Sequence, residues 1–254
     1  MKLKNPKQIG MIRESGKILA RTLHTLGGML EPGITPLDID AECRSLLRKA
    51  GARPAFLNYH GFPGALCVSV NEAVIHGIPN KRRLEDGDTV GLDLGVDLDG
   101  FISDSAYTFP VGNISEDVRK LMQITREALH KGIDAAKPRG RIHDISRAVY
   151  THVRPHGYGV VRPYCGHGVG FDVHEEPQVP NYVSSGPNPR LKPGMVLAVE
   201  PMINLGGDDV RVLSDDWTVV TADGSVSAHY EHTIAILEDR VAILTLPEEQ
   251  EEVA

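Results

Sequence analysis

Two aspartates lie on one face of a predicted β-hairpin. Residues 89–109 alternate apolar and polar side chains around Asp99-Gly100, which is a strong signal for a two-residue turn. With this turn, Asp93 and Asp104 form a diagonal pair across the two strands and reach toward a common point. Two carboxylates so placed repel each other unless a cation or a proton lies between them. A pair of solvated strand carboxylates is the alternative that this segment leaves open.

One histidine and two glutamates stand where a polar side chain needs an explanation. His167 lies between two glycines, where the backbone can approach a ligand closely because neither neighbour carries a Cβ, although such a histidine is also common in ordinary loops. Glu200 ends the strand predicted at about 195–200, and Glu231 interrupts the apolar strand predicted at about 228–237. Burying either carboxylate alone costs several kcal/mol, so each needs a partner unless it lies on an exposed edge strand.

Carboxylate oxygens together with one imidazole indicate a pair of divalent ions, for which Mn, Fe, Co and Zn are all suitable. Two ions about 3.5–4 Å apart would generate a hydroxide and hold both sides of an attacked carbonyl. Other chemistries fit less well, since the sequence has neither H-E-x-x-H nor G-x-S-x-G, and Phe171 replaces the last glycine of G-x-G-x-x-G. Glu175 and Glu176 are expected in a solvated turn before Pro177.

Composition excludes several classes of protein. The 254 residues carry 27 basic and 34 acidic side chains, a net charge of −7, which argues against nucleic acid or an anionic membrane as a partner. Three cysteines (Cys43, Cys67 and Cys165) are odd in number and show no C-x-x-C spacing, so a disulfide framework is not expected. The sequence has no apolar run of membrane-spanning length and no secretory signal pattern. A cytoplasmic protein is the resulting prediction.

The residue pattern predicts four helices and several strands around these side chains. Asn5-Pro6 and Thr35-Pro36 are typical helix starts, and Ser115 is a typical N-cap. The predicted helices run from Pro6 to Gly27, from Thr35 to about Gly51, from Ser115 onward and after Pro138, and strands beyond the hairpin are predicted at about 195–200, 217–221, 228–237 and 240–245.

These elements predict an α+β fold in a single catalytic domain, residues 1–254. A helix–helix–hairpin pattern that occurs twice suggests two pseudo-symmetric halves, at about 1–112 and 113–246, around a curved and largely antiparallel sheet. The site would then lie at the seam between the halves. Residues 247–254 form an acidic tail, expected to be a frayed end.

Four motifs carry a resemblance to a known family. They are Tyr164-Cys-Gly-His-Gly-Val-Gly with His174 and Val179-Pro-Asn-Tyr182, Asn71-Glu-Ala-Val-Ile-His-Gly-Ile-Pro79, Val199-Glu-Pro-Met202 and Tyr230-Glu-His-Thr233. With them, the chain resembles the type I methionine aminopeptidases, metallopeptidases of the pita-bread fold, from its first helix to about Leu246. The resemblance implies removal of the N-terminal methionine from nascent proteins and peptides.

The resemblance also implies roles for individual residues. Two divalent ions would be bound by Asp93, Asp104, His167, Glu200 and Glu231. Asp104 and Glu231 would bridge the ions, and Glu200 would also relay protons. His174 would donate a hydrogen bond to the scissile carbonyl, and His76 would contact the leaving amide nitrogen.

An apolar pocket would receive the methionine side chain, and the second substrate residue would have to be small. The matching pocket positions are Phe56, Tyr59, Phe62, Cys67, Val173 and Trp217. Main-chain carbonyls of Asn71 and Ala73, together with Ser227, would hold a monovalent cation. The family's habits further imply a monomer that meets nascent chains at the ribosome exit.

Only 31 residues separate Glu200 from Glu231, too few for the helical insertion of type II enzymes. The chain also begins close to its first helix, which implies a minimal bacterial form. The nearest alternative is a prolidase or Xaa-Pro aminopeptidase, which shares the five ligands but usually carries a large additional N-terminal domain. A catalytically inactive relative that binds ribosomes or RNA is the alternative from a different class.

Overall fold

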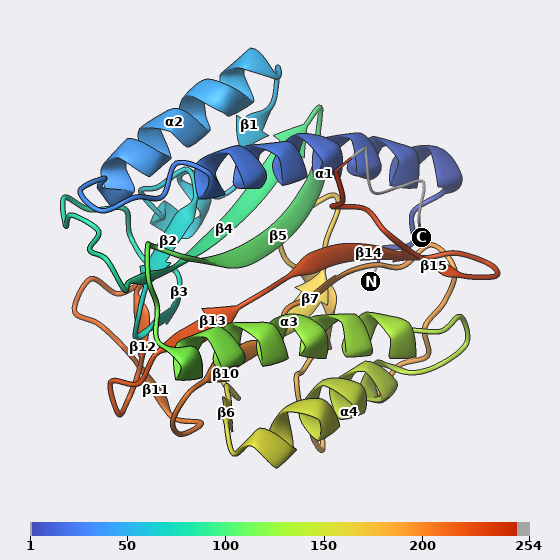
Figure 1. Cartoon of the computed structure of the whole chain (residues 1–254). Coiled ribbons are helices and arrows are strands. Elements are labelled where there is room, and N and C mark those ends of the chain that lie inside the picture. Colours follow the sequence, from blue (N-terminus) through green and yellow to red (C-terminus); the bar gives the residue numbers. More distant parts are fainter. Residues whose placement is uncertain (1, 248–254) are drawn as a thin grey trace.

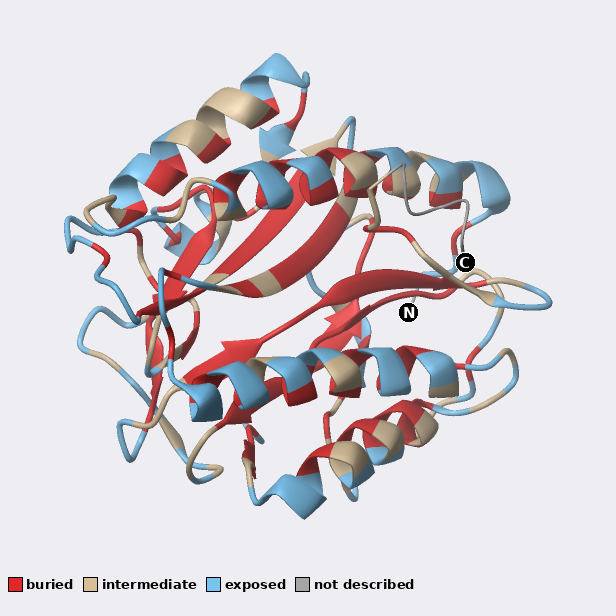
Figure 2. Cartoon of the chain, viewed as in Figure 1, coloured by how far each residue is buried: buried red, intermediate tan, exposed pale blue. Residues whose placement is uncertain are grey.

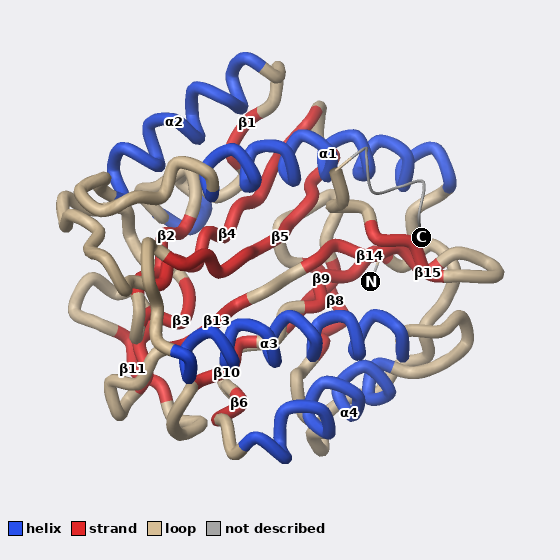
Figure 3. Tube along the Cα trace, in the orientation of Figure 1, coloured by secondary structure: helices blue, strands red, loops and turns tan. Residues whose placement is uncertain are grey.

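The computed structural model describes residues 2–247, so nearly all of the predicted acidic tail lies outside the described residues. Two pairs of helices lie on opposite sides of the molecule, with the strands between them (Figures 1 and 3). Every strand pair within residues 2–247 is antiparallel. The α+β class and the antiparallel character of the sheets are therefore confirmed.

The helices begin where their capping residues predict. Residues 2–247 contain four α-helices: α1 (Pro6–Gly27), α2 (Pro36–Lys49), α3 (Glu116–Ala135) and α4 (Ile142–Val153). The side chains of Asn5, Thr35 and Ser115 each accept a hydrogen bond from a backbone N–H of the first turn. These bonds satisfy amides that have no partner inside the helix, which is why the starts could be predicted from local sequence.

Fifteen strands are present in the described residues. They are β1 (Arg53–Pro54), β2 (Cys67–Val70), β3 (Ala73–Ile75), β4 (Thr89–Leu98), β5 (Phe101–Pro110), β6 (Gly159–Val160), β7 (Gly166–Gly168), β8 (Glu175–Val179), β9 (Val196–Val199), β10 (Met202–Asn204), β11 (Val210–Val212), β12 (Val219–Thr221), β13 (Ser227–His229), β14 (His232–Ile236) and β15 (Val241–Ile243). They form four sheets, in the orders β1-β4-β2 with β5 on β4, β13-β10-β6, β11-β12-β3 and β15-β14-β9-β7-β8.

The predicted hairpin is formed by β4 and β5. Leu98 pairs with Phe101 across Asp99-Gly100, and both turn residues have positive φ. The apolar side chains of β4, from Val90 to Val96, are fully buried on the face that α1 covers (Figure 2). The opposite face of the hairpin is therefore left for the aspartates, as predicted from the alternation.

One strand prediction is wrong. The segment 228–237 is not continuous but consists of β13 and β14, which are separated by Tyr230 and Glu231. β13 pairs with β10, whereas β14 pairs with β9 and β15, so the chain passes from one sheet to another at this point. Local β propensity could not indicate a change of pairing partner.

The two sides of the molecule are joined along β5. Thr233 Oγ1 donates to the carbonyl oxygen of Asp104 at 2.7 Å and accepts from the Asp104 N–H at 3.0 Å. Ser105 Oγ donates to the carbonyl oxygen of Glu231 at 2.5 Å. Two carboxylate-bearing segments that lie far apart in sequence are thereby held side by side. Within residues 2–247, no helix has the length and apolar character needed to cross a membrane.

Candidate metal centre

A pocket of about 340 Å³ opens between the sheets. Its acidic and imidazole lining includes all five predicted metal ligands, and the rest of its wall is largely aromatic or aliphatic. The lining residues are Phe56, Tyr59, His60, Phe62, Cys67, Ile75, His76, Asp93, Asp104, His167, His174, Glu200, Trp217 and Glu231. The structure thus brings into one pocket side chains from positions 56 to 231 of the sequence.

The hairpin register places the two aspartates as predicted. Asp93 on β4 lies opposite Ala106, and Asp104 on β5 lies opposite Gly95, so the two carboxylates share one face as a diagonal pair. Both side chains are buried, which contradicts the alternative of solvated strand carboxylates. A closely placed pair of buried carboxylates requires a proton or a cation as compensation.

His167 lies in the middle of the short strand β7. Its Nδ1 is 2.9 Å from the carbonyl oxygen of Gly168, and because a carbonyl only accepts, Nδ1 carries the proton. The other ring nitrogen, Nε2, lies 3.5 Å from Glu200 Oε1 and 3.9 Å from Asp104 Oδ2, and it is the atom that would offer a lone pair to a metal ion. Fixing the far nitrogen by a hydrogen bond is how proteins orient a histidine for metal binding.

The glycines that flank His167 serve the strands rather than a ligand. A Cβ at Gly166 would collide with the carbonyl oxygen of Ala198 on β9, and a Cβ at Gly168 would come within 2.5 Å of the carbonyl oxygen of Glu176 on β8. The expectation that these glycines let a ligand approach is therefore wrong. They allow β8 and β9 to pack tightly on both sides of β7.

Both glutamates lie at breaks between strands. Glu200 follows β9, and its carbonyl oxygen accepts from Asn181 Nδ2 at 2.9 Å. Glu231 lies in the gap between β13 and β14 and belongs to neither strand. His229 Nε2 lies 3.5 Å from Glu200 Oε2. His229 was not among the predicted site residues, although its position two residues before Glu231 would place both on the same face of the strand predicted there.

Three carboxylate oxygens in the pocket are buried without a hydrogen-bond partner. They are Asp93 Oδ1, Asp104 Oδ1 and Glu231 Oε1. Single donor atoms of Asp104, His167 and Glu231 all lie within 4.8 Å of one another. Unpaired buried carboxylate oxygens are costly, and hard oxygen donors with one imidazole nitrogen suit a divalent cation. The residues therefore fit a divalent metal ion.

Burial and mutual repulsion govern the pKa values of most of these carboxylates. Burial raises the pKa of Asp93 to about 7, and it raises the pKa of both Asp104 and Glu231 well above the usual range, with neighbouring carboxylates adding to the effect. Glu200 differs: burial alone would raise its pKa, but the nearby imidazoles of His229 and His167 bring the pKa below its ordinary value. A bound cation would favour the ionised form of all four.

Two further histidines face the pocket from outside the carboxylate group. His174 Nδ1 lies 3.0 Å from the Tyr59 hydroxyl, and its ring centroid lies 4.3 Å from that of His167. Partial burial and the His167 ring lower the pKa of His174 to about 4, so the ring is uncharged at neutral pH. Burial also lowers the pKa of His76, whose ring makes edge contacts with Tyr164 and Trp217. Both histidines can therefore act as neutral hydrogen-bonding groups.

The predicted methionine-pocket residues form one apolar cluster. Phe56, Phe62, Cys67 and Val173 are buried in it, and Tyr59 and Trp217 pack against them. Val173 contributes through this packing and lines a neighbouring pocket, not the one that contains the carboxylates. His60 and Ile75 also line the main pocket, and no sequence pattern pointed to either of them.

The residues predicted for a monovalent cation lie close to one another. The Ser227 N–H donates to the carbonyl oxygen of Asn71 at 3.0 Å, and Ala73 begins β3, which contacts β13. Asn71 has a positive φ of 55°, and its side-chain Nδ2 donates a hydrogen bond to Asp88 Oδ1.

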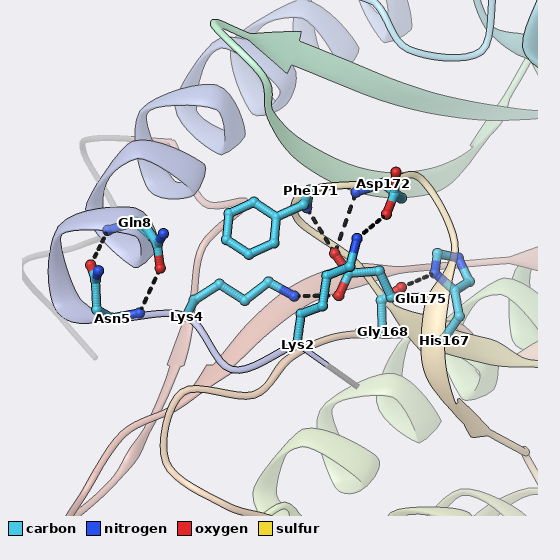
Figure 4. A network of polar contacts seen from close by, with 9 residues as sticks. All are labelled: Lys2, Lys4, Asn5, Gln8, His167, Gly168, Phe171, Asp172 and Glu175. Atoms are coloured by element: carbon cyan, nitrogen blue, oxygen red, sulfur yellow. Dashed lines mark hydrogen bonds and ion pairs between the residues drawn. The ribbon is translucent and has the colours of Figure 1, made fainter.

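The prediction for Glu175 is wrong. Its side chain is only 4% exposed and lies 2.6 Å from Nζ of Lys4, itself 1% exposed (Figure 4). Glu175 begins β8 and does not lie in a solvated turn, whereas Glu176 is exposed. The partner of Glu175 comes from 171 positions earlier in the sequence, so no local pattern could indicate it.

Comparison with known proteins agrees with the site. A model of metallopeptidase family M24 matches residues 10–238. Methionine aminopeptidase 1 of Bacillus subtilis (strain 168) is 50% identical over 242 residues, which cover 95% of this chain and 98% of that protein. The methionine aminopeptidase of Treponema pallidum (strain Nichols) is 48% identical over 252 residues, 99% of this chain and 98% of that protein.

Solved structures show the same fold. The crystal structure of methionine aminopeptidase from Thermotoga maritima matches with a TM-score of 0.94 at 41% identity, over 97% of this chain and 99% of that one. The prolidase from Pyrococcus furiosus matches with a TM-score of 0.80 at 25% identity, over 97% of this chain but only 66% of that one. The expected pita-bread fold is thus confirmed. The chain belongs to metallopeptidase family M24, among the methionine aminopeptidases.

Proposed function

We propose that this protein removes the N-terminal methionine from nascent proteins and peptides whose second residue is small. The observation that carries the proposal is the group of three unpaired carboxylate oxygens, on Asp93, Asp104 and Glu231, beside an apolar pocket. Relatives that cover nearly the whole chain at about half identity, all named methionine aminopeptidases, support it.

Two divalent ions would be held by the five pocket residues Asp93, Asp104, His167, Glu200 and Glu231. When bound, such ions activate water and polarise a carbonyl at neutral pH. Co, Mn, Fe and Zn all suit this donor set, so cellular supply decides which of them is used.

The chain's own residues would orient the substrate and move protons. Neutral His174 would donate a hydrogen bond to the oxygen of the scissile carbonyl, where negative charge develops in the transition state. Glu200, which keeps an ionised carboxylate, would accept a proton from water and return it to the leaving nitrogen. His76 would contact that same nitrogen from the other wall of the pocket.

Specificity for methionine would come from the apolar cluster at the pocket wall. Phe56, Tyr59, Phe62, Cys67 and Trp217 would surround the methionine side chain, and Val173 would support them through the same apolar cluster. The substrate α-amine would lie near Asp93, so only the first residue would be released. Asn71, Ala73 and Ser227 would bind a monovalent cation behind this wall.

Several wider properties belong to the same proposal. The chain would act in the cytoplasm as a monomer, on nascent chains near the ribosome exit, without binding nucleic acid or membrane itself. Residues 1–254 would form one catalytic domain built from two pseudo-symmetric halves, at about 1–112 and 113–246.

The test is a comparison of substrates with protein purified under reducing, oxygen-free conditions and loaded in turn with Mn, Fe, Co or Zn. We expect methionine release from Met-Gly-X and Met-Ala-X peptides and almost none from Met-Lys-X. A preference for X-Pro peptides would replace the proposal with a prolidase or Xaa-Pro aminopeptidase activity. Absence of any hydrolysis with all four metals would favour an inactive, binding role.

A further inference from the structure

A buried ion pair connects the N-terminal segment with the loop that leads into β8. Lys4 Nζ lies 2.6 Å from Glu175 Oε2, and both side chains are almost completely shielded from solvent (Figure 4). The Lys4 backbone N–H donates to the carbonyl oxygen of Gly194 at 2.7 Å, which fixes the segment just before α1. The stem of Lys4 lies against Gly170, where a Cβ would come within 2.8 Å of Lys4 Cε.

The Glu175 carboxylate organises its own loop. Its Oε1 accepts from the backbone N–H groups of Phe171 at 2.8 Å and Asp172 at 3.3 Å, while Oε2 takes the ammonium of Lys4. Lys4 Nζ also lies 5.1 Å from the centre of the Phe171 ring. The loop therefore folds around the carboxylate of Glu175, and the ammonium of Lys4 is the cation that pairs with this carboxylate.

This loop carries two residues of the proposed substrate site. Val173 packs in the apolar cluster with Phe56, and His174 immediately precedes Glu175 and faces His167. Neither Lys4 nor Glu175 lines the main pocket. The ion pair thus lies behind the loop, on the side away from the carboxylates that would bind metal.

We propose that Lys4 is a positioning residue: it holds the Glu175 carboxylate inside the loop and thereby fixes His174 beside the substrate and Val173 in the apolar cluster. The inference rests on the proposed function, because it assigns to Lys4 a part in that reaction. Removing one member of a buried ion pair leaves an uncompensated charge, whereas replacing both members with neutral groups is well tolerated. Comparing a single variant at Lys4 with a double variant at Lys4 and Glu175 therefore distinguishes a positioning role of Lys4 from a role in packing alone.

The decisive variants are Lys4→Met and Lys4→Met/Glu175→Gln. In the single variant, the Glu175 carboxylate regains solvation only by moving outward, which takes the N–H groups of Phe171 and Asp172 with it. In the double variant, the amide oxygen can still accept from both N–H groups and no charge remains to be solvated. Lys2→Met is the matched control, because Lys2 pairs with Asp172 on the same loop but both side chains are more than half exposed.

Three measurements are made on each full-length variant: kcat and KM for a Met-Gly-X peptide with saturating Mn²⁺, hydrogen exchange at the Phe171 and Asp172 amides, and Mn²⁺ affinity by calorimetry. For Lys4→Met we expect faster exchange at both amides and a fall in kcat of about tenfold to a hundredfold, the effect of a displacement of roughly 1 Å. Mn²⁺ affinity should change much less than kcat, because neither Lys4 nor Glu175 is one of the proposed metal ligands. The double variant should recover most of the kcat, and Lys2→Met should match the unchanged protein.

Normal kcat and normal exchange in Lys4→Met would overturn the proposal, and so would a double variant that exchanges normally but stays as slow as the single one. If Lys4→Met does not fold, Lys4→Met/Glu175→Ala takes its place, since it also lacks an acceptor for the loop amides. The kcat of Lys4→Met/Glu175→Ala must then be at least about tenfold lower than the kcat of Lys4→Met/Glu175→Gln. Equal kcat values would refute the inference. An unchanged protein without any peptidase activity would refute the proposed function instead, while the exchange data would still test the role of Lys4 in the loop.

Discussion

The backbone N–H of Glu231 donates to the carbonyl oxygen of Ala106 at 2.8 Å. Ala106 lies opposite Asp93 in the hairpin, so this bond attaches the segment of Glu231 directly to the pair of strands that carries Asp93 and Asp104. Hydrogen bonds to the main chain, this one and those made by the Thr233 and Ser105 hydroxyls, therefore set the spacing of the three acidic residues, and none of these bonds uses a carboxylate oxygen. The side chains remain free to bind something else.

Because the backbone holds the site, exchanging its carboxylates for amides should remove activity and keep the fold. We expect Asp104→Asn and Glu200→Gln each to lower kcat/KM for Met-Gly-X by more than about a hundredfold, since even changes beyond the direct ligands cost about 10- to 100-fold in metal sites. Circular dichroism and the melting temperature of the metal-free protein should be preserved. Glu116→Gln, on a side chain that is 88% exposed, is the matched control. Full turnover in either site variant would contradict the assigned roles.

The stability of the metal-free protein should report the raised pKa of Asp93. Burial raises this pKa from 3.8 to about 7, so between these values the unfolded chain has lost a proton that the folded protein still holds. The contribution of Asp93 to the free energy of unfolding therefore falls as pH rises through this window, with a slope approaching about 1.4 kcal/mol per pH unit.

An asparagine side chain does not titrate, so the Asp93→Asn variant should gain stability relative to the unchanged protein as pH rises through this window and then level off. Urea unfolding of both proteins in the presence of a chelator, at several pH values across this window, measures the difference. Saturating Mn²⁺ should reverse the order, because the ion stabilises the protein that binds it better. A difference that does not change with pH would show that Asp93 is not protonated in the folded state.

His174 should affect the chemical step and not the metal. We expect His174→Ala to lower kcat by about 10²- to 10³-fold, as loss of one donor to a developing oxyanion does, with metal content unchanged. Tyr59→Phe should lower kcat less, because it removes only the hydroxyl 3.0 Å from His174 Nδ1 that helps select the tautomer with a proton on Nε2. Metal analysis of both purified variants tests whether the metal content is unchanged. Loss of metal from His174→Ala would show that His174 is a metal ligand.

Trp217 should govern how well methionine is held. Its ring centroid lies 5.2 Å from that of Phe62 in an edge-to-face contact at the pocket wall. Because truncation removes apolar contact with the substrate side chain, we expect Trp217→Ala to raise KM for Met-Gly-X about tenfold or more, with a smaller change in kcat. Trp217→Phe keeps an aromatic wall and should lie close to the original value. An unaltered KM in the alanine variant would place the methionine side chain elsewhere.

Local sequence was sufficient for the helix starts and for the hairpin. Asn5, Thr35 and Ser115 cap their helices through bonds that span three residues, and Asp99-Gly100 fixes the register of its strands by its own backbone conformation. These interactions are complete within a few residues, so their signals can be read from the chain. The same logic correctly placed Asp93 and Asp104 on one face.

Only the tertiary structure decided what depends on pairing between distant segments. The division of 228–237 at Glu231, the close packing that requires glycine on both sides of His167, and the burial of Glu175 against Lys4 all involve partners far away in sequence. A residue's type and its near neighbours are the same whether such a partner is present or not. Burial and charge compensation are therefore properties of the folded chain, and they explain why Glu175, predicted to be solvated, is one of its most enclosed acids.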